Sequence, residues 1–215
     1  MITVSDDPVD VETRLREGGL CCPGCSGRLS PWGSARPRTI RYGIDGVGPV
    51  RVHRPRRARC SGCGVTHVLL GVGLAVRRAD AAEVIAVAVE SKVVRGRGHR
   101  VIAARLGRPV TTVRGWLRAF ASSASRIAQW FTGRVVRDAP DAAVLWPVPA
   151  GSTAGAALSA LLAYAQGLGR RFGVVGTVAW VRAGIAASGG RLFSAGFWAA
   201  GVQHGLALPG GVGQG

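Results

Sequence analysis

CCPGC at residues 21–25 and CSGCG at residues 60–64 decide how this 215-residue chain folds. Each stretch contains two cysteines separated by two residues, in the glycine-containing kind of turn that directs two thiolates at one metal ion. The four candidate ligands are Cys22, Cys25, Cys60 and Cys63. Because four thiolates complete the tetrahedral shell that Zn(II) prefers, at about 2.3 Å from each sulfur, we predict one structural zinc site. The alternative is a disulfide pair, which is typical of secreted proteins, or unrelated buried thiols.

Three further side chains compete for the ligand positions. Cys21 adjoins Cys22, but it would leave three residues instead of two before Cys25, so we predict that Cys22 is the ligand and Cys21 its possible substitute. His53 and His67 are predicted to be surface or strand histidines, since four cysteines already complete the shell.

The segment between the cysteine pairs has the pattern of β-strands. Thr39, Ile40, Val50 and Val52 are β-branched residues spaced by arginines, and glycines in residues 43–48 favour a turn between two strands. VTHVLLGVG, which follows the second pair, predicts another strand. We therefore predict a zinc ribbon over residues 21–75, in which the metal supplies on the order of 10 kcal/mol of folding free energy.

The charge of the chain points to a polyanionic partner. The formal net charge is +17, and all but one of the 28 basic residues are arginines. Residues 1–20 contain five acidic and two basic residues, so we predict a flexible, solvated acidic arm there. Arginines crowd the strand before the second cysteine pair, and guanidinium groups suit phosphate oxygens. The predicted phosphate contacts in this segment are Arg54, Arg56, Arg57 and Arg59.

Residues 79–137 have the pattern of a helix-turn-helix. Asp80 and Glu83 have the spacing of a capping box, which predicts a helix over about residues 81–94. In RVIAARLGRPVTTVRGWLRAF, Ala103 suits a close helix crossing, Gly107 a tight turn, and Val113 an apolar anchor in the second helix. We predict a recognition helix over about residues 109–120.

The outward positions of this motif are candidates for DNA contacts. Threonine methyl groups contact thymine and arginine forks onto guanine, so the predicted base-reading residues are Thr111, Thr112, Arg114 and Arg118. The predicted phosphate contacts are Arg100, Arg105 and Arg108. The alternative is an ordinary helical hairpin with solvated arginines.

An apolar seam continues past the motif. Its residues step by four and three: Val113, Leu117, Phe120, Ala124, Ile127 and Phe131. Such a seam predicts a helix extending beyond the motif, either as a homodimer interface or packed against C-terminal helices.

The remaining chain is alanine-rich. We predict helices over residues 154–167 and 174–187 within a helical region spanning residues 138–198, and a glycine-rich, disordered tail over residues 199–215. The apolar run from residue 154 to 165 is too short to cross about 30 Å of hydrocarbon, so no membrane contact is expected. The N-terminal stretch lacks a basic start and an apolar core, from which we expect a cytoplasmic protein.

CPGC, PWG, RPRRARCSGCGVTHVLL and GHRVIAARLGRPVTTVRGWL, in this order, carry a resemblance over Cys22 to Phe120. This part of the chain resembles the N-terminal DNA-binding part of bacterial insertion-sequence transposases, and is similar to actinobacterial proteins of unassigned function. The resemblance implies a zinc ribbon, a helix-turn-helix and recognition of element ends, with catalysis assigned to a later acidic domain.

No acidic residue follows Asp141 in this chain, whereas DNA cleavage by two metal ions needs clustered carboxylates. We therefore predict a protein that is not an enzyme: a zinc-stabilised double-stranded DNA-binding protein, either a mobile-element-related factor or a transcriptional regulator. The alternative is a zinc-ribbon module that docks onto a transposase or transcription partner.

Overall fold

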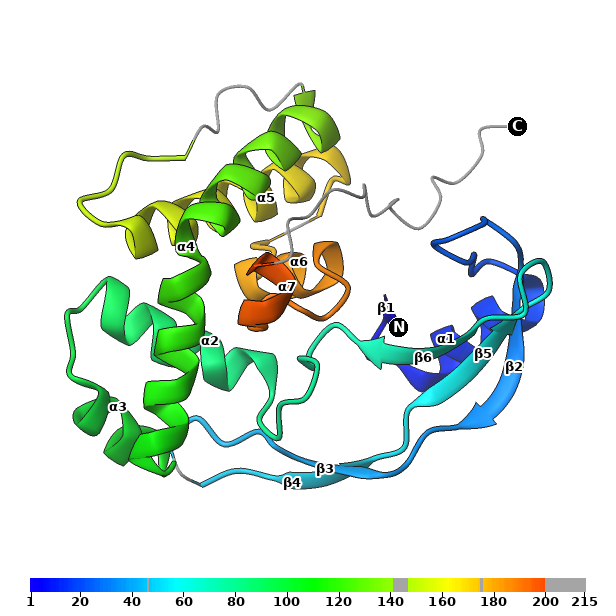
Figure 1. The fold of residues 1–215 in the computed structure, drawn as a ribbon, viewed down its shortest axis with the longest axis horizontal. Coiled ribbons are helices and arrows are strands. Elements are labelled where there is room, and N and C mark those ends of the chain that lie inside the picture. Colours follow the sequence, from blue (N-terminus) through cyan, green and yellow to red (C-terminus); the bar gives the residue numbers. More distant parts are fainter. Residues whose placement is uncertain (46, 141–146, 175, 200–215) are drawn as a thin grey trace.

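The computed structural model describes residues 1–45, 47–140, 147–174 and 176–199, which pass from a mainly β region to a helical body (Figure 1). The strands are β1 (Ile2–Val4), β2 (Leu29–Ser34), β3 (Arg38–Arg41), β4 (Val50–His53), β5 (Arg56–Cys60) and β6 (Thr66–Gly71). The helices are α1 (Pro8–Glu17), α2 (Ala82–Val93), α3 (His99–Leu106), α4 (Val110–Asp138), α5 (Thr153–Arg171), α6 (Trp180–Ala187) and α7 (Ala195–Ala199). The predicted order of a small β region followed by mainly α structure is confirmed.

The four-stranded sheet has the order β1-β6-β5-β2, in which only β1 and β6 are parallel. Leu29, Ala58 and Leu69 are buried beneath it, in a small core separate from that of the helical body. Strands β3 and β4 form a separate antiparallel hairpin. In Figure 1 this hairpin runs from the sheet toward α3 and the start of α4.

The prediction of a flexible, solvated arm over residues 1–20 is wrong, because Ile2–Val4 form β1 and Pro8–Glu17 form α1. Asp7 caps α1 by accepting a hydrogen bond from the Val9 N–H at 2.9 Å. Val11 and Leu15, one helical turn apart, are buried in the core of the sheet. The acidic side chains lie on the other faces of α1, so the charge count concealed an amphipathic helix.

The predicted capping box is also wrong. Ala81 is the N-cap of α2, with no side-chain hydrogen bond. Asp80 is instead buried, with its carboxylate 2.8 Å from Arg41 Nη2 and 2.5 Å from Arg108 Nε. Two guanidinium groups compensate a buried carboxylate far better than one helix terminus does, so the side chain turns inward.

Helices α3 and α4 are joined by a three-residue turn that begins at Gly107. Gly107 has φ of +59°, and its N–H donates to the carbonyls of the last turn of α3. Ile102 and Leu106 of α3 and Val113 of α4 are buried together in the core of the helical body. The turn therefore requires a left-handed residue, as the sequence pattern indicated.

Gly107→Ala is expected to lower the free energy of unfolding by about 1–2 kcal/mol, because an L side chain is disfavoured at positive φ. Gly133 is the matched control: it lies within α4, and a Cβ there would meet no atom within 4 Å. Gly133→Ala should stabilise by up to about 1 kcal/mol. Urea denaturation measures the free energy of unfolding of both variants. Equal effects of the two substitutions would contradict the requirement for a left-handed residue at Gly107.

The apolar seam of α4 packs within the chain. Val113, Phe120, Ala124, Ile127 and Phe131 are each at most 2 % exposed in the core shared with the neighbouring helices. Of the two interpretations of the seam, packing against C-terminal helices is the correct one. The homodimer through this seam is not supported, because the residues that would form it are already covered.

The C-terminal helices differ in part from the prediction. α5 includes the predicted residues 154–167, but α6 begins only at Trp180, since Gly173 and Gly176 have φ of +59° and +101° and end helical structure before it. The predicted disordered tail, residues 199–215, lies outside the described residues except for Ala199, which ends α7. Among the described residues, no helix has both the length and the apolar character needed to span a bilayer.

Candidate metal centre and basic surface

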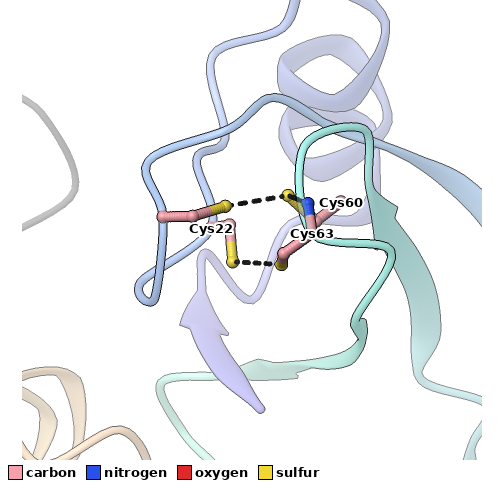
Figure 2. A group of neighbouring side chains, drawn as sticks. Cys22, Cys60 and Cys63 are labelled. Atoms are coloured by element: carbon pink, nitrogen blue, oxygen red, sulfur yellow. Dashed lines mark hydrogen bonds between the residues drawn. The ribbon is translucent and has the colours of Figure 1, made fainter.

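The four predicted cysteine ligands lie together. Their Sγ atoms are all within 4.8 Å of one another, with 3.7 Å between Cys22 and Cys63 and 3.4 Å between Cys25 and Cys60. Figure 2 shows Cys22, Cys60 and Cys63 directing their thiols toward one another from two facing loops. Four sulfurs at about 2.3 Å from one ion are separated by about 3.8 Å in a regular tetrahedron, so the cluster fits one metal ion. The choice of Cys22 over Cys21 agrees with this geometry, because Cys21 is outside the cluster.

Each cysteine loop has the backbone that a metal knuckle requires. Ser26 and Gly64 follow the second cysteine of their loops with φ of +58° and +71°. In the second loop, the N–H groups of Gly62 and Cys63 point at Cys60 Sγ, at 3.3 and 3.5 Å. Such N–H groups stabilise a thiolate, so the loop favours the form of cysteine that binds metal.

Hydrogen bonds within the cluster shift the pKa values of two of its thiols in opposite directions. The Cys63 N–H, helped by hydrogen bonds from Cys25 and the Gly62 N–H, outweighs the opposing effect of burial and lowers the pKa of the Cys60 thiol to about 6. The Gly27 N–H acts to lower the pKa of Cys25, but hydrogen bonding with Cys60 and Cys63 outweighs it and raises that pKa to about 12. Cysteine binds a metal ion as the thiolate, so binding of a metal ion by this cluster is expected to release protons.

His67 is not one of the four clustered residues, but it contacts one of them, Cys22. It is 7 % exposed, and its Nε2 lies 3.4 Å from Cys22 Sγ. Burial lowers the pKa of His67, which favours its neutral form. His67 lies in strand β6, but its contact with Cys22 had no signal in the sequence, because it depends on the pairing of His67 with Ala58 across β5 and β6. His53, in contrast, contacts Tyr42.

The candidate DNA contacts on α3 and α4 are mostly exposed. The exposed ones are Arg100, Arg105, Thr111, Arg114 and Arg118, whereas Thr112 is half-buried. Within the described part of the chain, these four arginines have no carboxylate partner. Their charge is therefore available to an external anion.

The arginines before the second cysteine pair divide into two groups. Arg54 and Arg59 are exposed, and Arg57 is half-buried. Arg56 is instead engaged inside the chain, with Nη2 3.3 Å from Glu12 Oε2 on α1. The guanidinium of Arg59 lies over the ring of Trp32, 4.8 Å from its centroid.

Arg108 is not a surface residue, which corrects its prediction as a phosphate contact. Its side chain is 6 % exposed, and it donates to Asp80, to the Gly43 carbonyl at 3.1 Å and to the Leu106 carbonyl at 2.9 Å. A guanidinium enclosed in this way is not accessible to an external phosphate. Arg108 directly follows Gly107, and its hydrogen bond to the Gly43 carbonyl links the α3–α4 turn to the β3–β4 hairpin.

The fold and the site define a β unit with a cluster of four cysteines that could hold one metal ion, joined to a helical body with an arginine-rich surface. Comparison of the chain with protein-family models, with curated proteins and with solved structures finds no match. The resemblance to transposase DNA-binding parts therefore stays a prediction.

Proposed function

We propose that this chain is a zinc-stabilised double-stranded DNA-binding protein without catalytic activity of its own, acting as a mobile-element-related factor or a transcriptional regulator. The observation that carries the proposal is the division between its engaged and free arginines. Arg41, Arg56, Arg108 and Arg182 pair with carboxylates inside the chain. Most arginines of α3, of the start of α4 and of the strand before Cys60 face solvent instead, and they have no such partner among the described residues.

The start of α4 is proposed as the recognition helix of a helix-turn-helix. Thr111, Arg114 and Arg118 are spaced by three and four residues, so they form one exposed stripe, while Val113 and Trp116 are buried on the opposite side. A helix with one anchored face and one polar stripe is suited to the major groove, where arginine forks onto guanine.

Zinc is the metal we propose for the cysteine cluster. Four thiolates in tetrahedral separation are the ligand set of structural zinc sites, and thiolate ligands disfavour magnesium and calcium. With all four positions occupied by protein, the ion has no open position for a substrate, so its role is to stabilise the fold.

A second candidate function is a docking module for a transposase or transcription partner. Trp32 is 51 % exposed on the sheet, and exposed tryptophans are frequent anchors of protein interfaces. In this case the contact of the arginines with DNA is incidental, and substitution of the α4 stripe leaves the partner bound.

Selection of bound duplexes from a random DNA library tests the proposed function. We expect a defined motif with zinc-loaded protein, and Arg114→Ala should cost about 1–3 kcal/mol at one base position. Arg170→Ala on α5 removes the same charge from another exposed site and should leave the motif unchanged.

The salt dependence gives an independent measurement. With about six free arginines on phosphates, the affinity should fall on the order of 10³-fold between about 50 and 200 mM salt. An affinity that is flat with salt, or a random library without enrichment, would refute the proposal and favour the docking function.

A further inference from the structure

A cavity of about 440 Å³ lies between the sheet and the helical body. Strands β1 and β6 and the starts of α1 and α2 line it on one side, and the β3–β4 hairpin lines the other. Its floor is apolar, with Val4, Leu69, Leu70, Leu74 and Ala81 among the lining residues. This volume is within the range of small-molecule sites, which often occur where two structural units meet.

The register of the hairpin directs polar side chains into this cavity. Arg51 pairs across the strands with Ile40, so the two share one face, and Ile40 is fully buried. Val50 and Val52 take the opposite face and are 62 % and 71 % exposed. Arg51 is therefore on the side of the hairpin that faces the body, and it is a lining residue.

The hairpin wall is held in place by contacts among its own side chains. The Tyr42 hydroxyl lies 2.5 Å from His53 Nε2, and the Arg51 guanidinium lies 5.7 Å from the centroid of the Tyr42 ring. All three residues line the cavity, together with Arg54. The wall thus has ordered groups before any ligand arrives, which lowers the entropic cost of binding.

Some charged side chains that line the cavity have an ion-pair partner within the protein and others do not. Two carboxylates line the cavity, and Arg182 of α6 pairs with both, at 2.8 Å from Asp6 Oδ2 and 2.9 Å from Glu83 Oε1. The Asp6 carboxylate lies on the sheet side, where it also accepts a hydrogen bond from the Gly73 N–H at 3.0 Å. On the hairpin side, Arg51 and Arg54 have no carboxylate partner among the residues that the structure describes. One wall therefore carries two uncompensated guanidinium groups above an apolar floor.

We propose that this cavity binds a small organic anion, with a carboxylate head held by Arg51 and Arg54 and an apolar body on the floor formed by Leu69, Leu70 and Leu74. Guanidinium forks match a carboxylate in geometry as well as in charge. An inorganic anion can pair with the arginines but leaves the apolar floor in contact with water. The ligand therefore needs both a carboxylate head and an apolar body.

Occupancy of this cavity is expected to weaken DNA binding, because Arg54 is also a candidate phosphate contact. By linkage, DNA weakens the binding of the organic anion by the same factor. This consequence rests on the proposed DNA-binding function, whereas binding of the anion itself does not. The two are separated by measuring anion binding without DNA.

Titration of the zinc-loaded full chain with phenylacetate, followed through backbone amide shifts by NMR, tests the proposal. We expect saturable shifts at Gly71 and Gly73, which line the cavity, with Kd between about 10 μM and 1 mM. Phenylacetamide is a neutral molecule of nearly the same shape, and we expect it to bind about tenfold more weakly or worse. We expect the same of inorganic phosphate, which has the charge but no apolar body.

A variant in which both Arg51→Gln and Arg54→Gln are made should also lose at least about tenfold in phenylacetate affinity, while Arg114→Gln on α4 should not. Both variants replace exposed side chains, so we expect both to fold, which the dispersion of the same amide spectra checks. The proposal is overturned if phenylacetate gives no saturable shift, if phenylacetamide or phosphate binds as tightly, or if the double variant binds normally.

Discussion

Cys60→Ser is expected to unfold the β unit of the protein and to abolish stoichiometric zinc binding. The core under the four-stranded sheet is small, and two of its buried residues, Cys22 and Cys60, are themselves members of the metal cluster. Loss of the metal therefore removes both the link between the two loops and part of the packing. Structural zinc sites contribute on the order of 10 kcal/mol at neutral pH, more than a core of this size supplies.

The helical body should persist in the same variant. Its core, which includes Phe120, Ile127 and Phe131, is distinct from the core of the sheet. Amide hydrogen exchange is therefore expected to show loss of protection in β5 and β6 and continued protection in α4 and α5. Chelation of the metal from the unmodified chain should produce the same pattern.

Cys21→Ser is the matched control, because it removes an exposed thiol next to Cys22 that lies outside the cluster. It should retain one equivalent of zinc and full protection of the sheet. If Cys60→Ser keeps both properties, or if Cys21→Ser loses them, the assignment of the four ligands is wrong.

The metal cluster was predictable from the sequence because its signal is local. Two cysteines separated by two residues define each half of the site, and the glycines and turn residues beside them define the backbone. The length of α4 was equally accessible, since its seam repeats at helical spacing from Val113 to Phe131 and the structure continues this helix to Asp138.

The roles of Asp80 and Arg108 were not predictable in the same way, because the contact that defines them joins residues from three distant segments. A local pattern assigned Asp80 to a helix cap and Arg108 to a DNA surface. The structure places both in one buried cluster with Arg41 of β3. Only the packing of the hairpin against the α3–α4 turn brings these charges together.

This buried cluster connects the metal-binding unit to the proposed recognition helix. Arg41 belongs to the hairpin that extends from the sheet, and Arg108 immediately follows the glycine between α3 and α4. Arg108 also donates to the Gly43 carbonyl next to the hairpin turn. Asp80 therefore sets how the hairpin lies against α4, and thus how the two candidate DNA-contacting surfaces are spaced.

Asp80→Ala is expected to lower the free energy of unfolding by about 3–5 kcal/mol, because it leaves the buried Arg108 guanidinium without its counterion. Arg41, whose side chain is 39 % exposed, regains water and adds little to this cost. The matched control is Glu83→Ala, which breaks the more exposed pair with Arg182 and should cost at most about 1 kcal/mol.

Urea denaturation of the zinc-loaded variants measures both effects. A double variant with Asp80→Ala and Arg108→Met should recover part of the loss, since an uncharged side chain of similar length needs no counterion in a buried position. Equal destabilisation by Asp80→Ala and Glu83→Ala, or no recovery in the double variant, would show that Asp80 does not act by compensating Arg108.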